Sequence, residues 1–382
     1  MKKVYVHISV LLLSVIVLAV AGVITVYADE YETLPPEYSD FSDSISGELA
    51  DKLPNGVFSD DANEINKAAE QMISPSAILS ALIDALGVGI TNAVPTLALM
   101  LGIVILSAVL STVSANLAGT SRAAENCVKL CTFTAIAGVA VGSVESLTLY
   151  FERLFASVAS FLPLSAALYA MGGNIGAAAS SSAALGITLT VCQFFCTNTV
   201  VPVFCICLCM SLVSVFDGPA ASAGGTVGAS IRKWYMTSVS FVMMILTCSV
   251  AGSTLLSAKA DNMAMRGAKF AISNFVPISG GTVSSTLGTL AASVEMLRGS
   301  VGVIGIVAII LMLLPTIVEI ALLRGVFALG SFCASTLGCG GEARLLSDLE
   351  SLYGFLEGIA VLSAAVFVIS FGLFAAISTP FG

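Results

Sequence analysis

The chain has 382 residues, of which 57% are hydrophobic and only 10% are charged. Soluble domains carry about a quarter charged residues, so this composition excludes an ordinary water-soluble protein and indicates a polytopic membrane protein. One segment between Asp29 and Glu70 holds twelve acidic residues and two lysines, which accounts for the whole net charge of −9. The remainder is close to neutral, which argues against a nucleic-acid-binding surface, since such a surface needs clustered Lys and Arg.

The first 28 residues have the organisation of a secretory signal peptide. Lys2 and Lys3 precede an apolar stretch, and Val26-Tyr27-Ala28 places small or branched residues where a signal peptidase inspects the chain. We expect cleavage after Ala28. The alternative is an uncleaved anchor helix, since the apolar run is long for a signal. In both cases the following segment begins outside the cytoplasm.

Residues 29–75 are predicted to form an acidic extracytoplasmic arm. The residues from Ser59 to Ile73 read as one short capped helix. The rest of the arm is expected to be extended and mobile, because it is acidic and poor in apolar residues. Composition leaves two interpretations open, a solvated spacer and a docking arm for an extracytoplasmic partner.

Residues 76–382 are predicted to form an all-α, multi-spanning membrane domain. A span needs about 20 apolar residues. The segment 183–216 is too long for one straight span, so we expect it to tilt, bend or break. Pro95, Pro202 and Pro315 each lie within an apolar segment, and we expect helix kinks there because proline removes a backbone hydrogen bond. The expected spans lie near residues 88–115, 127–145, 183–216, 234–257, 300–325 and 355–378.

A Phe-x-Pro phrase followed by a glycine pair occurs twice, and the second copy follows the charged Arg266 and Lys269. We interpret both copies as breaks between membrane segments, forming re-entrant elements beside a polar path. Non-helical backbone survives at membrane depth only where protein or a water-filled cavity surrounds it. The residues assigned to these elements are Pro163, Gly172, Gly173, Pro277, Gly280 and Gly281.

Together with the recurring prolines, these phrases predict internal repeats of about 110 residues, an arrangement common in transporters and channels. The approximate units are 76–182, 183–299 and 300–382. If the units run parallel, each contains one kinked helix and one returning helix, and both phrases lie on the outer side with the arm.

The sequence argues against an enzyme. The only histidine is His7, inside the predicted signal peptide, so the mature chain has no imidazole for a nucleophile pair or for a metal. No P-loop motif exists to hold ATP. In Cys205-x-Cys207-x-Cys209, positions two apart point in different directions on a helix, and we expect these cysteines to serve packing. No cofactor or metal is predicted.

The charged residues within predicted spans that are candidates for a function are Glu319, Arg324 and Glu357. Ionisable groups at membrane depth are expensive and often functional. One interpretation of Glu319 is that its side chain faces a polar cavity. Arg324 and Glu357 have the alternative of an interfacial position in which they snorkel. The spacing Gly354-x-x-x-Gly358 is taken as a helix-packing surface.

With these residues in hand, the chain resembles the stage III sporulation protein AE family of endospore-forming bacteria. The matching features are the cleavable signal, the acidic arm, Arg232-Lys233-Trp234 before a span, and the motif from Arg266 to Gly281. Ile278-Ser279 is a small departure from the apolar residues expected there.

The resemblance implies a multipass protein made in the mother cell and placed in the membrane around the forespore. It implies partners as well: the other stage III sporulation proteins AA to AH, among them an ATPase subunit, and stage II sporulation protein Q. Together these are similar to a secretion apparatus or channel that permits late forespore gene expression. Further copies of the chain itself are another expected partner.

We therefore expect a membrane component of such a complex, with its N-terminal arm outside the cytoplasm. The main alternative is a stand-alone secondary transporter for a small solute. An intramembrane protease is disfavoured by the absent histidine.

Overall fold

The computed structural model describes residues 35–49, 53–59, 61–72, 75–114, 121–213, 219–275 and 280–376. All regular structure in these ranges is helical. The all-α fold predicted from the sequence is therefore confirmed. The elements are α2 (Glu37–Leu49), η1 (Asn55–Phe58), α3 (Ala62–Met72), α4 (Pro75–Ser114), α5 (Ser121–Met171), α6 (Ile175–Gln193), η2 (Phe194–Thr199), α7 (Val200–Val213), α8 (Pro219–Phe275), α9 (Gly280–Thr336) and α10 (Gly340–Ala376).

Within the described ranges, six helical segments are long and apolar enough to cross a membrane. This agrees with the predicted polytopic architecture, although the boundaries differ. The second segment extends to Met171, well beyond the predicted end at residue 145. The segments are Leu79–Leu110, Thr134–Met171, Ile175–Leu212, Gly225–Ala264, Val294–Thr336 and Gly340–Ala376.

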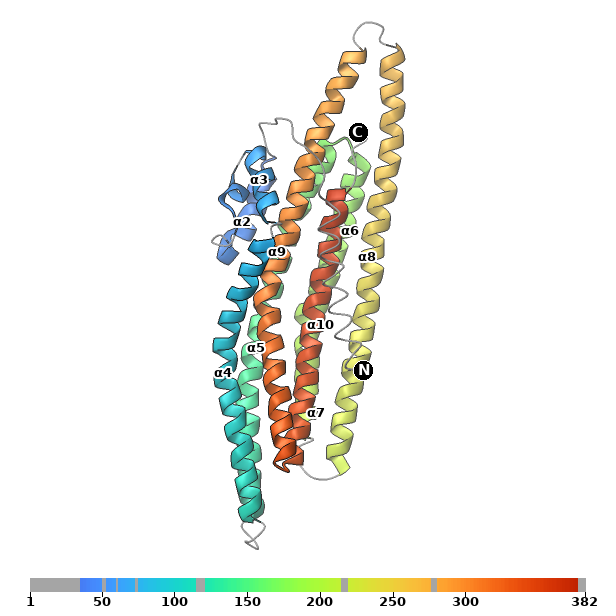
Figure 1. Cartoon of the computed structure of the whole chain (residues 1–382). Helices are drawn as coiled ribbons and strands as arrows, with labels where there is room; N and C mark the ends of the chain where they lie inside the picture. Colours follow the sequence, from blue (N-terminus) through green and yellow to red (C-terminus); the bar gives the residue numbers. More distant parts are fainter. Residues whose placement is uncertain are drawn as a thin grey trace.

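The long helices pair as three hairpins along the chain: α4 with α5, α6–η2–α7 with α8, and α9 with α10 (Figure 1). Each first partner contains one of the recurring prolines, at 95, 202 or 315. The hairpins turn between Met171 and Ile175 and between Phe275 and Gly280, earlier than the expected unit boundaries near residues 182 and 299. A common symmetry that relates the units remains a prediction.

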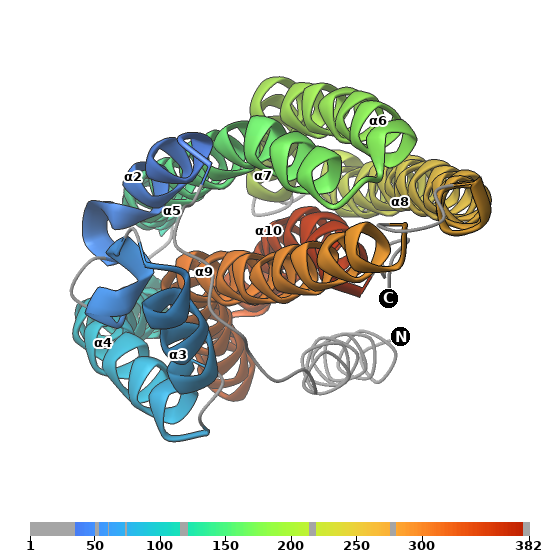
Figure 2. The same cartoon turned by 90° about the horizontal axis from the view of Figure 1, so that it is seen from above.

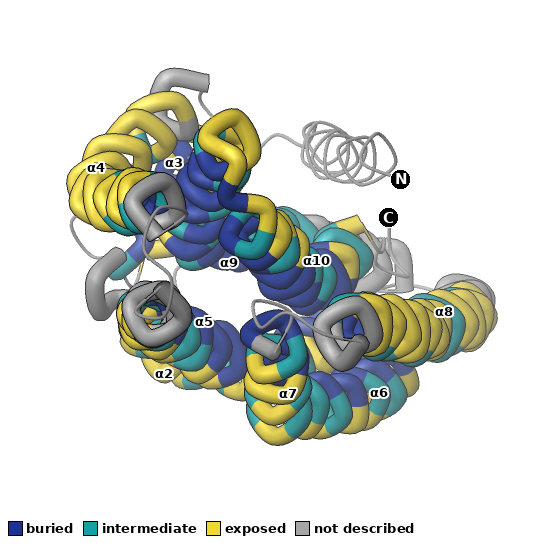
Figure 3. The backbone as a smooth tube through the Cα atoms, turned by 90° about the horizontal axis from the view of Figure 1, so that it is seen from below, coloured by how far each residue is buried: buried dark blue, intermediate teal, exposed yellow. Residues whose placement is uncertain are grey.

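Helices α9 and α10 lie at the centre, and the other long helices form an arc around them (Figure 2). The most apolar window of α9 is 72% buried and that of α10 is 67% buried, against 22% for α8. Every residue from Val301 to Ile309 is buried, as expected for a helix that is apolar all round. The outer faces of α4 and α8 are exposed (Figure 3). The core therefore follows the interface between α9 and α10, which we call the central seam.

Helices α8 and α9 are far longer than a membrane is thick. Each has 57 residues, which corresponds to about 85 Å at about 1.5 Å per residue. The hydrocarbon core of a bilayer is about 30 Å. Their adjoining ends, at Phe275 and Gly280, project beyond all other labelled elements at the end of the molecule that carries α2 and α3 (Figure 1). We call this end the arm end.

The described part of the acidic arm is folded, which corrects the expectation of an extended, mobile segment. Tyr38, Phe41 and Ile45 of α2 are almost fully buried, as are Val57 and Ile65. They join the core of the bundle because one face of each short helix is apolar, while acidic residues occupy the other. The predicted capped helix is present as α3, with the Asp61 carboxylate accepting from the Asn63 amide at 2.8 Å.

The re-entrant interpretation of the first phrase is also corrected. Pro163 lies inside the continuous helix α5, not in a break. Its neighbours Phe161 and Leu164 are fully buried, and packing by adjoining helices lets a membrane helix continue through a proline. In the second phrase, Gly280 and Gly281 are the first residues of α9, whereas Pro277 lies outside the described residues.

Candidate functional site

The Phe-x-Pro phrase of α5 takes part in an aromatic cluster at the arm end. The Phe161 ring stacks on Phe371 of α10 with centroids 3.8 Å apart and meets Phe374 edge-on at 5.0 Å. Phe41 from the arm approaches Phe161 at 5.6 Å. Such pairs contribute beyond the apolar area they bury. The phrase therefore holds the folded arm against α5 and α10, a packing role that we had not predicted for it.

A fully buried arginine, Arg298, lies next to this cluster. Arg298 of α9 donates from Nη2 to the carbonyl oxygen of Phe374 at 2.9 Å, and its guanidinium lies 4.5 Å from the centre of the Tyr169 ring. Phe374 is in the last turn of α10, where carbonyls lack helical partners. Arg298 thus caps α10 and joins it to α5 and α9. Sequence reasoning gave Arg298 no role. The signal available was its position just before a long apolar run.

The glycine pair at 172–173 forms a tight turn that reverses the chain between α5 and α6. The Gly173 amide bonds to Ala170 O at 3.0 Å, and the Asn174 amide bonds to Tyr169 O at 2.9 Å. This is the Schellman pattern of helix termination. Gly173 has φ 81, a left-handed conformation that glycine adopts without a Cβ penalty. The glycines therefore end α5 and reverse the direction of the chain, so that α6 runs back along the bundle.

An acidic residue from another helix caps the start of α6. The Asp261 carboxylate of α8 accepts hydrogen bonds from the amides of Gly176 at 3.2 Å and Ala177 at 2.7 Å. A carboxylate at a helix N-terminus satisfies unpaired amides and interacts favourably with the helix dipole. A Cβ at Gly176 would come within 2.7 Å of Asp261 Oδ1. The turn is therefore tied to α8.

The structure brings two of the three predicted intramembrane charges together. Arg324 of α9 forms an ion pair with Glu357 of α10, and both side chains are largely covered by protein. Gly354 makes room for the guanidinium, since a Cβ there would lie 3.2 Å from Arg324 Cζ. The pair therefore joins the two central helices. One glycine of the predicted packing motif serves this contact.

Glu319, the third intramembrane charge, lies apart from that pair. Ser146 of α5 and Tyr353 of α10 lie near its carboxyl group. The Tyr353 hydroxyl is 3.0 Å from Ser143 Oγ. Three helices therefore contribute to one polar cluster in the middle of the bundle.

The long apolar segment expected to bend at Pro202 contains a π-helical turn, η2, just before that proline. Proline cannot donate a backbone hydrogen bond and its ring clashes with the carbonyl four residues earlier. A wider turn accommodates both effects. Tyr235 of α8 supports η2 through its hydroxyl, which bonds to Thr199 and to the Phe195 carbonyl. Pro95 and Pro315 lie within continuous helices α4 and α9.

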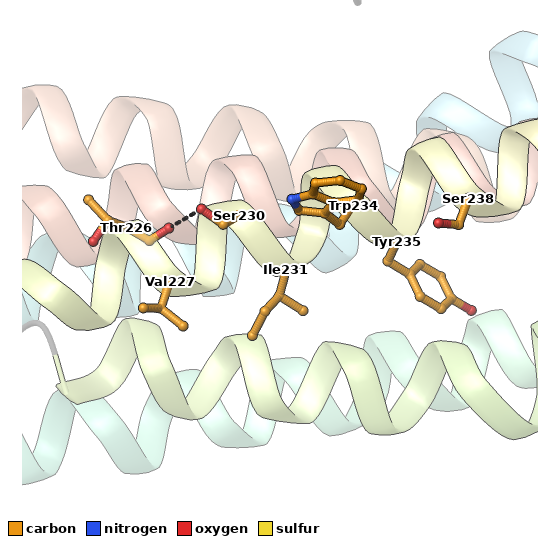
Figure 4. A pocket seen from close by; sticks show the side chains of 7 residues that line it. All are labelled: Thr226, Val227, Ser230, Ile231, Trp234, Tyr235 and Ser238. Carbon is orange, nitrogen blue, oxygen red and sulfur yellow. Dashed lines mark hydrogen bonds between the residues drawn. The ribbon is translucent and has the colours of Figure 1, made fainter.

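A shallow groove follows α8 next to this turn (Figure 4). All of its lining residues come from α8, so it is an open helix face and not an enclosed cavity. Trp234 is 75% exposed. The lining residues are Thr226, Val227, Ser230, Ile231, Trp234, Tyr235 and Ser238.

The remaining predicted residues contribute little to a site. Ala28, the predicted cleavage position, lies outside the described residues. Cys207 is buried while Cys205 and Cys209, one helical turn apart on the same face, are exposed, so the three thiols do not converge. Among the described residues, no group of three or more His, Cys, Asp or Glu could hold a metal ion. The candidate site is therefore the polar cluster and ion pair of the central seam, with the aromatic cluster at its arm end.

Comparisons with known proteins give one match. No curated protein and no solved structure matches the chain. The family model for stage III sporulation protein AE matches residues 59–379, which is most of the chain. The match includes the six apolar segments and the last third of the arm, residues 59–75. The chain belongs to the stage III sporulation protein AE family, and it is a multi-pass membrane protein of sporulation.

Proposed function

We propose that the protein is a membrane component of a channel-like or secretion-like complex between mother cell and forespore, needed for late forespore gene expression. It acts in assembly and conduction, in the mother-cell membrane around the forespore, with its arm outside the cytoplasm. Its partners are the other stage III sporulation proteins AA to AH, including an ATPase subunit, and stage II sporulation protein Q.

One observation carries this proposal most strongly. The projecting ends of α8 and α9 and the folded arm lie at the same end of the molecule (Figure 1). Helices of about 85 Å extend well beyond a bilayer core of about 30 Å. A transporter that moves a small solute alone needs no such extension, whereas a subunit that meets partners outside the bilayer does.

The test replaces Gly280 and Gly281, at the projecting start of α9, with Leu. We expect late forespore transcription to stop while the amount of protein in the membrane stays normal. The matched control replaces Gly138 and Gly142 of α5 with Leu, since a Cβ at either position meets nothing within 4 Å. The control should sporulate normally. Normal late transcription in the Gly280/Gly281 variant would remove the proposal for this end of the molecule.

A second experiment separates the proposal from the transporter alternative. Crosslinking in sporulating cells should capture the partner proteins with the wild-type chain and lose them when the arm is deleted. Purified protein alone in liposomes should give no solute flux. Flux without partners, together with capture that does not depend on the arm, would favour the transporter.

A further inference from the structure

The charge pattern of α8 marks where the bilayer meets this molecule. Residues 234–258 carry no charged side chain, whereas the exposed Lys233 precedes them and the exposed Lys259 follows them. This stretch is about 37 Å long at about 1.5 Å per residue, close to the hydrocarbon core of about 30 Å. The most apolar window of α8 is only 22% buried by protein, which leaves most of its surface for lipid. Lys233 and Trp234 therefore lie at one bilayer surface, towards the end of α8 that is opposite the arm end (Figure 1).

The shallow groove on α8 crosses this boundary. Its lining extends from Thr226 to Ser238 and includes Trp234, whose side chain is 75% exposed. Val227 and Ile231 point toward the adjacent helix and supply apolar surface to the groove (Figure 4). Tryptophan is enriched at bilayer surfaces because its ring is amphipathic. An open groove with apolar side chains at this depth suits a lipid molecule that lies along the helix.

Two hydrogen-bond donors of α8 remain available at the boundary. Ser230 donates its hydroxyl proton to Thr226 O at 2.9 Å, and Thr237 donates its own to Lys233 O at 2.8 Å. Both hydroxyl protons are therefore engaged within the helix. The Lys233 ammonium and the Trp234 indole N–H have no hydrogen-bond or ion-pair partner among the described residues. Both groups donate, so they suit a ligand that supplies acceptor oxygens.

The positive charge of Lys233 decides which headgroup fits. The other cation at this level, Arg232, is 6% exposed, and it lies near Asp348 of α10, so it faces the bundle. Lys233 is exposed instead. A basic side chain at a bilayer surface attracts anionic lipids. A zwitterionic headgroup carries an ammonium group of its own, which cancels much of that attraction.

We propose that the groove of α8 binds an anionic phospholipid. The Lys233 ammonium pairs with the phosphate of the headgroup, and the Trp234 indole N–H donates to a phosphate or ester oxygen. One acyl chain lies along α8 from Trp234 toward Ser238, at the depth of the hydrocarbon core. This inference requires only that the protein resides in a membrane, and it does not depend on the proposed function.

The test uses Trp234 as the reporter, since it is the single tryptophan of the chain. The full-length protein is reconstituted in phosphatidylcholine vesicles, and part of the lipid is replaced by phosphatidylglycerol or phosphatidylcholine with brominated acyl chains, which quench a tryptophan that they touch. Brominated phosphatidylglycerol should reach half-maximal quenching at a roughly five-fold lower mole fraction, the effect of one lysine at an anionic surface. Equal quenching by the two lipids would overturn the proposal.

Variants assign the preference to the groove. Lys233→Gln should abolish the preference for phosphatidylglycerol, whereas Lys233→Arg should retain it, because the charge remains. The matched control is Lys259→Gln, which removes the exposed lysine at the other end of the uncharged stretch and should behave like wild type. A preference that survives Lys233→Gln contradicts the proposal. So does the absence of quenching by either lipid, since protein would then cover Trp234.

Discussion

Replacing Phe41 with Ala tests whether the aromatic cluster holds the arm on the bundle. Phe41 is 1% exposed, and its ring lies 5.6 Å from Phe161 and 6.4 Å from Phe371. Removing a core phenylalanine costs about 3–5 kcal/mol, part of it for the cavity that remains. The arm lies at the edge of the bundle and can partly collapse, so we take about 3 kcal/mol. Since about 1.4 kcal/mol is tenfold, the undocked population should rise roughly a hundred-fold.

Hydrogen exchange of the α2 and α3 amides measures that population, because an undocked short helix exchanges rapidly. Exchange in the Phe41→Ala protein should accelerate in both helices, while the central part of α9 stays protected. The matched control is Asp40→Asn, the adjacent and exposed position on α2, which should exchange like wild type. Equal exchange in Phe41→Ala and wild type would show that the cluster does not hold the arm.

Three further predictions follow from the contacts. Gly354→Leu should displace the Arg324 guanidinium, which lies 3.2 Å from the position of the new Cβ, and lower the midpoint of thermal unfolding. The control Gly138→Leu, whose Cβ would meet nothing within 4 Å, should leave that midpoint unchanged. Equal midpoints for the two variants would contradict the contact. Asp261→Ala should cost about 0.5–2 kcal/mol, the usual value of a lost N-cap, seen as faster exchange of the first α6 amides; unchanged exchange would count against the cap. Burial raises the pKa of Tyr38, so the folded arm retains the phenolic proton more strongly than the unfolded arm, and docking should weaken as pH rises above about 10. Tyr38→Phe should remove that dependence in the exchange assay, and an unchanged dependence would refute it.

The sequence by itself determined the class of the protein. A chain that is 57% hydrophobic and 10% charged can hide its backbone polar groups in a bilayer only as helices, because each helix satisfies its own hydrogen bonds. Six apolar segments followed from this, and the short capped helix within residues 59–73 followed from its local sequence. The sequence also predicted that Pro202 disturbs the helix of its long apolar segment, since proline acts on the backbone of its own turn. The family followed from the motif that ends in Gly280-Gly281.

Only the tertiary structure decided what the interruptions and charges do. Pro163 looked like a break, but α5 continues through it, and the helix is packed there against residues some 200 positions away, such as Phe371. The arm looked mobile because its composition is acidic, while one apolar face of each short helix finds the bundle. Arg324 and Glu357 pair across two helices, whereas Glu319 does not. Local sequence encodes helix formation, but the partner of a side chain depends on which helices pack together, and in a membrane small differences in packing decide that.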